Sequence, residues 1–307
     1  MASFFPLFRK ITDNILGAEG PVFDSKGNFY MVAPEVEKEK NPAGQILKVD
    51  ILSGTTEVLC EPVINGDGGI PAGCQTDKHG NIYVADMRLG ILLVQPNGDF
   101  EQLSAQDSEG HNMQGCNDCA MDYYGNLWVT APAGEIAPSP YRRSFEEPFG
   151  SIYCLTKDRK VVHLDTGIRF PNGIAVIHDK EDKPVKLIVA ETPTRLLWSY
   201  DILGPGSVRN KTVWGKLPDC DCESGPDGMD FDETGHLLVA HWGSGYIEVF
   251  PPTGGEPVQR IKCPFDKPSN LHFKNNSYEV YVTEHTNHGL WSFEWEHKGM
   301  AQYCDKH

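Results

Sequence analysis

Short apolar stretches alternate with glycine- and asparagine-containing turns along the whole chain. Six segments share one pattern: an apolar stretch, a turn that often ends in Gly-Asn, and a second apolar stretch that ends near Val-Ala or Val-Thr. A third alternating apolar segment follows each second stretch, and most repeats have room for a fourth. Equivalent positions of the second stretch lie 43 to 60 residues apart. They are Met31, Val84, Val129, Val189, Val239 and Val282.

This repeat predicts an all-β fold. Short, evenly spaced strands joined by Gly, Asn and Pro turns are typical of antiparallel sheets. A four-stranded unit of roughly 40–50 residues, repeated six times, is typical of a β-propeller. We therefore expect residues 1–307 to form a single domain, a six-bladed β-propeller with four-stranded antiparallel blades around a central channel. The ring needs a closing strand from one chain end, and residues 5–12 and 301–304 are the two candidates.

Composition and charge narrow the classes of partner. The chain is 39% hydrophobic, which supports a packed core and excludes disorder. Its 43 acidic and 27 basic residues give a net charge of −16, which argues against nucleic acid and against an anionic membrane surface. No apolar run approaches the ~18 residues of a membrane-spanning helix, and the first 14 residues do not read as a signal peptide. We expect a cytoplasmic monomer that binds a small molecule.

Nine cysteines are too few for a disulfide scaffold, so we expect reduced thiols. Two close pairs stand out, Cys116 with Cys119 and Cys220 with Cys222. The pairs lie about 100 residues apart, whereas a structural zinc site needs four closely grouped soft ligands. We therefore expect neither zinc binding nor redox chemistry.

Oxygen-bearing side chains recur where the first strand of each repeat begins. In a propeller this strand lines the channel, so equivalent positions converge on the axis. Turn formation alone explains Asn and Asp at strand starts, but it does not explain a glutamate. Carboxylate and amide oxygens favour Ca²⁺ over zinc or copper. The six equivalent residues, of which all but Ala72 carry a side-chain oxygen, are Glu19, Ala72, Asn117, Asn172, Asp227 and Asn270.

Asp230 and His272 form a second candidate pair, further along the fifth and sixth inner strands. Alternation along a strand turns both side chains toward the channel. On the residues alone, an Asp–His hydrogen bond explains this pair without a metal, because imidazole is an unusual ligand for Ca²⁺.

Longer motifs carry a family resemblance. The runs GAEGPVFD, GGIPAGCQ, QGCNDCAMD, FPNGIAV, AETPT, PDGMDFDE and PSNLHFK are similar to the diisopropyl fluorophosphatase family. That family belongs to a six-bladed superfamily that also contains gluconolactonase and paraoxonase. The resemblance covers residues 6–303. The stretch from Pro218 to Pro226, with its two cysteines, departs from the family pattern.

The resemblance implies two calcium ions and a substrate pocket. Glu19, Asn117, Asn172 and Asp227 match the side chains that hold a catalytic calcium. Asp230, the carbonyl of Leu271 and His272 match the ligands of a structural calcium. Asp118 would lie beside the catalytic site. The pocket would be lined by Glu35, Ile70, Met87, Tyr141, Arg143, Phe170, Thr192, Trp242, Ser269 and His285.

The implied activity is calcium-dependent hydrolysis of phosphotriester-like compounds, including cleavage of a P–F bond. Asp227 would attack phosphorus, and a calcium-bound water is the rival nucleophile. We interpret His285 as a pocket wall rather than as a general base. One alternative is a lactonase or arylesterase that uses the same calcium site. The other is a calcium-binding propeller without turnover.

Overall fold

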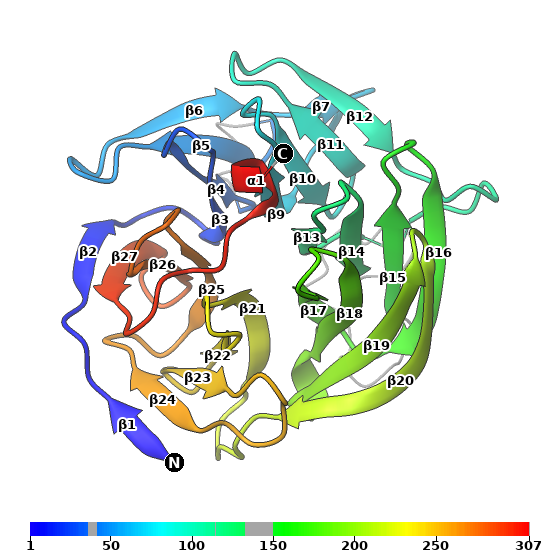
Figure 1. Ribbon diagram of the computed structural model, residues 1–307. Coiled ribbons are helices and arrows are strands. Elements are labelled where there is room, and N and C mark those ends of the chain that lie inside the picture. The colour runs from blue at the N-terminus through cyan, green and yellow to red at the C-terminus, as the bar shows by residue number, and fades with distance from the viewer. Residues whose placement is uncertain (36–41, 114, 133–149, 307) are drawn as a thin grey trace.

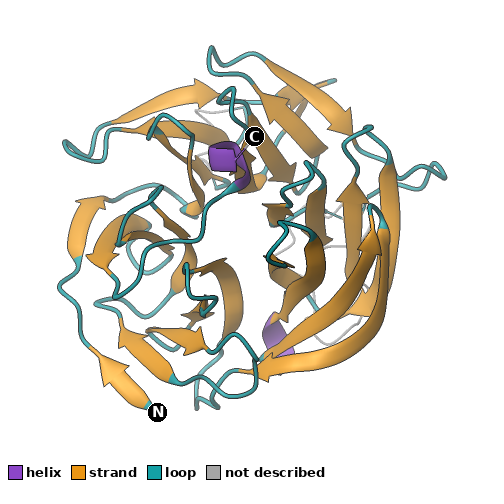
Figure 2. Ribbon diagram, viewed as in Figure 1, coloured by secondary structure: helices purple, strands orange, loops and turns teal. Residues whose placement is uncertain are grey.

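The computed structural model describes residues 1–35, 42–113, 115–132 and 150–306. Six sheets surround a central channel (Figure 1). Nearly all regular structure is strand (Figure 2), which confirms the predicted six-bladed all-β propeller with four-stranded antiparallel blades. No helix in these ranges is long and apolar enough to span a membrane.

The first three sheets follow the chain order, with the first strand of each innermost. Neighbouring inner strands contact one another around the channel. The strands are β3 (Glu19–Phe23), β4 (Phe29–Ala33), β5 (Gln45–Val49) and β6 (Thr56–Cys60); β9 (Pro71–Thr76), β10 (Ile82–Asp86), β11 (Gly90–Val94) and β12 (Phe100–Ser104); β13 (Cys119–Met121), β14 (Leu127–Ala131), β15 (Gly150–Leu155) and β16 (Val161–Ile168).

The last three sheets complete the ring in the same way. Minor elements are a hairpin of β7 (Val63–Ile64) and β8 (Asp67–Gly68), and a 3-10 turn, η2 (Thr192–Thr194). The strands are β17 (Pro171–His178), β18 (Pro184–Glu191), β19 (Leu196–Gly204) and β20 (Ser207–Lys216); β21 (Gly225–Phe231), β22 (Leu237–Trp242), β23 (Tyr246–Phe250) and β24 (Gln259–Lys262); β25 (Pro268–Phe273), β26 (Glu279–Glu284) and β27 (Gly289–Glu294).

The N-terminal segment closes the ring. Strand β2 (Arg9–Thr12) pairs antiparallel with β27 and supplies the fourth strand of the last sheet, so the first of the two predicted candidates is correct. Strand β1 (Ala2–Phe4) adds a fifth, parallel strand to β24, which the repeat did not predict. The other candidate, residues 301–304, runs instead into the short helix α1 (Tyr303–Lys306) over the channel (Figure 1).

An aspartate fixes the hairpin turn after most inner strands. The Asp24 carboxylate accepts hydrogen bonds from the backbone N–H groups of Lys26 and Asn28, each at 2.9 Å. These bonds satisfy donors that the turn leaves unpaired. The same arrangement recurs in the next four sheets, at Asp77, Asp122, Asp179 and Asp232.

The core is divided among the gaps between sheets. Six hydrophobic clusters of buried side chains each join two neighbouring sheets. Trp128, for example, is wholly buried between the third and fourth sheets, and its indole N–H donates to Asp122 at 3.0 Å. Burying a large apolar side chain contributes about 1.5–3 kcal/mol, so each cluster stabilises the packing of two neighbouring sheets.

Candidate active site

The predicted ring of oxygen donors lies at the centre of the propeller. Glu19, Asn117, Asn172 and Asp227 all line one cleft of about 700 Å³ at one end of the channel. Each side chain sits at or just before the start of an inner strand or, for Asp227, early in β21. The repeat therefore brings together four residues that are spread over more than 200 positions of the chain.

Two glycines allow the inner strands to approach closely enough for this convergence. A Cβ atom on Gly173 would lie 2.0 Å from the backbone oxygen of Asp227. A Cβ atom on Gly228 would lie 1.9 Å from the side-chain oxygen of Asn270. Any other residue at these two positions would push apart the strands that carry the ring.

The ring concentrates negative charge in a buried place. Desolvation, followed by repulsion from Glu19 and Asp118, raises the pKa of Asp227 well above its ordinary value. Desolvation and Glu19 likewise raise the pKa of Asp118 to about 8. Among the described residues that line the cleft, the one Arg and the one Lys make other contacts, since Arg195 pairs with Asp219 and Lys267 lies over the Trp242 ring.

A hard cation fits this donor set. Burial is the larger cause of the raised pKa values of Asp227 and Asp118, and repulsion between carboxylates that converge without a cation adds to it. In the described part of the chain, no three His, Cys, Asp or Glu side chains gather closely enough to hold a metal ion. A metal site here would therefore depend on the amide oxygens of Asn117 and Asn172 as well as on the two carboxylates. A mixed set of this kind suits Ca²⁺.

Thr192 and Thr130 hold Asn172 in place. The Asn172 side-chain amide donates to the Thr192 hydroxyl at 3.3 Å, and that hydroxyl donates to the Pro226 carbonyl at 2.8 Å. The Thr130 hydroxyl donates to the Asn172 carbonyl at 2.7 Å. These contacts orient Asn172 and link it to the segment that carries Asp227.

The two ring nitrogens of His285 differ, because one accepts a hydrogen bond and the other carries the proton. The indole N–H of Trp242 donates to His285 Nδ1 at 3.1 Å. Because an indole can only donate, Nδ1 is the acceptor and the proton sits on Nε2. That nitrogen lies 3.4 Å from a Glu19 carboxylate oxygen. His285 therefore faces the ring with an N–H group, an arrangement suited to a wall residue and not to a base.

A second, narrower cavity of about 60 Å³ lies further along the channel. Asp230, Leu271 and His272 line it, as the family resemblance implies for a structural calcium. His272 Nδ1 is 3.5 Å from Asp230, while its buried Nε2 has no hydrogen-bond partner among the described residues. Asp230 accepts backbone hydrogen bonds from Phe231 and Phe273 and two more from the Gln302 amide. The unpartnered Nε2 leaves a donor atom for an ion.

The remaining predicted site residues fall into four groups. Glu35, Phe170, Thr192, Trp242 and His285 line the cleft. Ile70, Met87 and Ser269 are not among the lining residues, and the buried Ser269 hydroxyl donates to the Ala18 carbonyl. Asp118 faces the narrow cavity, back to back with Asn117. Tyr141 and Arg143 lie outside the described residues.

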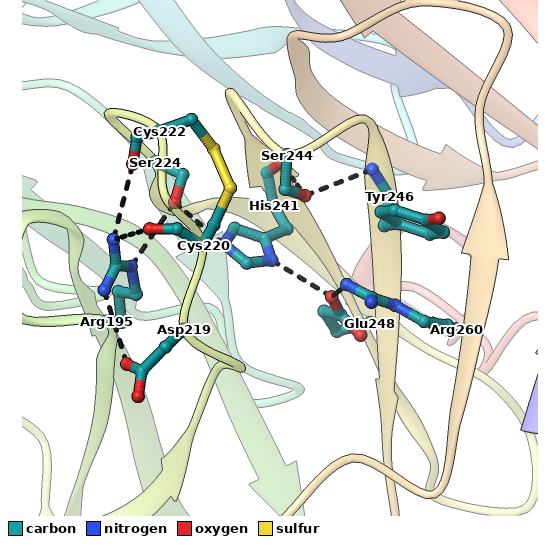
Figure 3. Close-up of a disulfide and its surroundings, with 10 residues drawn as sticks. All are labelled: Arg195, Asp219, Cys220, Cys222, Ser224, His241, Ser244, Tyr246, Glu248 and Arg260. Atoms are coloured by element: carbon teal, nitrogen blue, oxygen red, sulfur yellow. Dashed lines mark hydrogen bonds and ion pairs between the residues drawn. A yellow bond between two sulfur atoms is a disulfide. The ribbon is translucent and has the colours of Figure 1, made fainter. Parts of the chain in front are cut away.

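The loop before β21 differs from the sequence-based expectation. Cys220 and Cys222 form a disulfide (Figure 3), so the expectation of nine reduced thiols is wrong for these two. The other seven cysteines are free and buried. Burial raises the thiol pKa of Cys116 and Cys119, which keeps both protonated. The sequence also gave no signal that Arg195, Glu223 and Ser224 line the cleft, because none of them lies at a repeated position.

Comparisons with known proteins agree with this architecture. The family model for the SMP-30/Gluconolactonase/LRE-like region matches residues 17–286. The chain is 60% identical over 301 residues to diisopropyl-fluorophosphatase of Loligo vulgaris, covering 98% of this chain and 96% of that protein. It is 24% identical over 290 residues to gluconolactonase of Zymomonas mobilis, covering 88% of this chain and 79% of that protein.

Among solved structures, that of a calcium-binding protein, regucalcin, from Agrobacterium tumefaciens has the same fold. Its TM-score is 0.76 at 20% sequence identity, and the match covers 98% of each chain. The resemblance to diisopropyl fluorophosphatase predicted from the sequence motifs is confirmed. The chain belongs to the SMP-30/gluconolactonase/LRE-like family.

Proposed function

We propose that this protein is a phosphoric triester hydrolase that cleaves P–F and similar bonds in the wide cleft, with calcium as its cofactor. The observation that carries the proposal is the 60% identity over nearly the whole chain to a diisopropyl-fluorophosphatase. The buried acidic ring at the floor of the cleft supports it, because such a ring needs a cation.

Glu19, Asn117, Asn172 and Asp227 would hold the catalytic calcium. A bound calcium ion would polarise the phosphoryl oxygen and stabilise the charge that develops on it. Asp230, the Leu271 carbonyl and His272 would hold a second ion that stabilises the fold. The regucalcin neighbour, described as calcium-binding, supports calcium as the metal.

The side chains of the cleft divide the remaining work. Asp227 attacks phosphorus and fluoride leaves, which forms an acyl phosphate; water then attacks its carboxyl carbon, releases the phosphate and returns the carboxylate with one oxygen from water. Direct attack by water is the rival pathway. Trp242 and Phe170 provide apolar walls that receive alkyl groups and exclude bulk water. His285, whose Nε2 lies 3.4 Å from a Glu19 carboxylate oxygen, forms part of the cleft wall beside the ring.

Fluoride release from diisopropyl fluorophosphate tests the proposal. We expect steady release with calcium, loss after chelation, and recovery when calcium but not magnesium is restored. Single turnover in ¹⁸O-labelled water separates the two nucleophiles, because attack by Asp227 leaves the label in that carboxyl group. Absence of fluoride release from folded, calcium-loaded protein would overturn the proposal.

A lactonase is the second candidate function, favoured by the match to a gluconolactonase. A lactone carbonyl oxygen would take the place of the phosphoryl oxygen in the same cleft. Parallel assays with an aldonolactone and with diisopropyl fluorophosphate compare the two kcat/KM values. Calcium binding without either activity would indicate a non-catalytic calcium-binding propeller. That this protein is a monomer and that it is cytoplasmic both stay predictions.

A further inference from the structure

The wall of the cleft holds a second set of reactive side chains, apart from the acidic ring. Ser224 lies on the loop that leads into β21 and lines the cleft, with a relative exposure of 8%. It is three residues from Asp227 in sequence. The mechanism proposed above gives Ser224 no role.

Ser224 begins a continuous chain of hydrogen bonds into the fifth sheet (Figure 3). Its hydroxyl oxygen lies 3.3 Å from His241 Nε2. The other ring nitrogen of His241, Nδ1, lies 3.0 Å from a carboxylate oxygen of Glu248. Arg260 forms an ion pair with the same oxygen. His241 and Glu248 are both fully buried.

The direction of each hydrogen bond follows from the arginines at the two ends. Arg260 and His241 Nδ1 both donate to the Glu248 carboxylate, which can only accept. The imidazole proton therefore sits on Nδ1, and Nε2 presents a lone pair to Ser224. At the other end, Arg195 Nε donates to the Ser224 oxygen at 3.3 Å. The serine proton is thus directed at His241.

This order of groups is that of a nucleophile, a base and an orienting carboxylate. A buried histidine held by a carboxylate is the usual means of activating a serine hydroxyl. The Arg195 guanidinium beside the hydroxyl oxygen can also stabilise negative charge that develops there. A histidine that only filled the core would need neither a carboxylate nor a serine hydroxyl beside its ring nitrogens.

The loop that carries Ser224 is fixed on both sides. Arg195 Nη2 donates to the carbonyl oxygens of Cys220 and Cys222, at 3.1 and 3.4 Å. The disulfide between these cysteines closes the loop beside Ser224 (Figure 3). A nucleophile must be held in position to react, and these contacts hold it.

We propose that Ser224, His241 and Glu248 form a serine esterase site on the wall of the cleft, which accepts small carboxylic esters with good leaving groups, such as aryl esters. Ser224 Oγ attacks the ester carbonyl carbon while its proton passes to His241 Nε2. The C–O bond to the phenol breaks, and the phenolate leaves with that proton. Water then hydrolyses the acyl-serine, returning the hydroxyl and releasing the acid.

Covalent labelling of the full chain tests this site. We use Asp227→Asn protein, so that the acidic ring does not consume the reagent, and treat it with an alkyl fluorophosphonate probe. We expect one phosphonyl group per chain, located on Ser224 by peptide mass spectrometry. Turnover of p-nitrophenyl acetate measures esterase activity in the same protein.

Three further substitutions in this background define the expected pattern. Ser224→Ala should abolish labelling and lower p-nitrophenyl acetate turnover at least about 100-fold, since the nucleophile is removed. His241→Gln should lower the labelling rate at least about 100-fold, the usual contribution of a general base. Ser244→Ala is the matched control, because its hydroxyl donates to the His241 carbonyl and not to the ring. It should label at the parent rate.

Labelling at another residue, no labelling, or an unchanged labelling rate in folded His241→Gln protein would overturn the inference. Circular dichroism melting of each variant establishes that it is folded. Fluoride release by protein with Asp227 intact is measured in parallel. Normal fluoride release without labelling overturns only the serine site, whereas normal labelling without fluoride release overturns only the proposed function.

Discussion

The two cavities on the propeller axis are lined by adjacent residues of the same inner strands or of the segments just before them. Asn117 faces the wide cleft of about 700 Å³, and its neighbour Asp118 faces the narrow cavity of about 60 Å³. Glu19 and Gly20 divide in the same way. Adjacent residues thus face different cavities at both places, so two successive positions of the repeat serve the two sites.

The two sites differ in how many hydrogen bonds the protein itself donates to their carboxylate oxygens. At the narrow site, Asp230 receives hydrogen bonds from two backbone N–H groups and from Gln302 of the C-terminal segment. At the wide site, burial and then repulsion from Glu19 raise the pKa of Asp227 well above its ordinary value. A site closed by the chain suits a structural role, whereas a site with unsatisfied charge and open volume suits the binding of a substrate.

Neutralising the wide site should have the largest effect. Asp227→Asn removes the proposed nucleophile and one of two ring carboxylates, and we expect fluoride release to fall at least about a thousandfold. The fold should persist, because the amide has the same shape. Initial rates and far-UV circular dichroism measure the two effects. Asp99→Asn, an exposed aspartate far from the axis, is the control. Retained turnover in Asp227→Asn would contradict the assignment.

The narrow site should govern stability instead of turnover. Calcium at about 100 times its Kd should raise the free energy of unfolding by about 2.7 kcal/mol, since only the folded chain presents the ligands. Thermal melting with and without a chelator measures this effect. Asp230→Asn should melt lower and respond less to chelation, and Asp227→Asn should keep much of the response. An unchanged melting temperature under strong chelation would argue against a structural ion.

His178, another residue of the narrow cavity, should make stability depend on pH. Desolvation lowers its pKa to about 4, and the Tyr123 backbone N–H donates to its Nε2 at 3.1 Å. The unfolded chain takes up this proton near pH 6.5, so stability falls as pH drops from about 6.5 to about 4. We expect a loss of about 1–2 kcal/mol, reduced because the ring is only partly buried.

Urea unfolding at several pH values measures this loss. His178→Gln should flatten the profile between pH 6.5 and pH 4. The exposed His163→Gln is the control and should leave the profile as it is. An unchanged slope in His178→Gln would show that other groups cause the acid sensitivity.

The smallest effect is expected from the disulfide beside the cleft. The Cys220–Cys222 bond closes a loop of only three residues, so loop-closure entropy limits its contribution to at most about 1.6 kcal/mol. Denatured, unreduced protein should contain the seven free thiols of the buried cysteines. Reduction should expose two more. Because disulfides are rare in cytosolic proteins, finding nine thiols before reduction would favour the cytoplasmic expectation over the bond.

Much of the floor of the cleft was predictable because it follows the repeat. Glu19, Asn117, Asn172 and Asp227 occupy one equivalent position in four blades, and a closed ring brings such positions together. Asp230 and His272 follow from alternation on the same strands. The walls were harder to predict. Trp242 and His285 came from the family resemblance, whereas Arg195 and Ser224 lie on connections outside the repeat.

The sequence by itself determined the six-bladed architecture and the acidic ring, since periodic hydrophobic and polar positions specify both, and it narrowed the closing strand to two candidates. Only the tertiary structure decided that β1 pairs with β24, that Gln302 reaches Asp230, and that Ser224 meets His241 and Glu248. These contacts join segments with no shared period, and their partners become neighbours only after the sheets have packed. The local pattern of hydrophobic and polar residues encodes the blades, whereas these side-chain hydrogen bonds depend on how the blades pack.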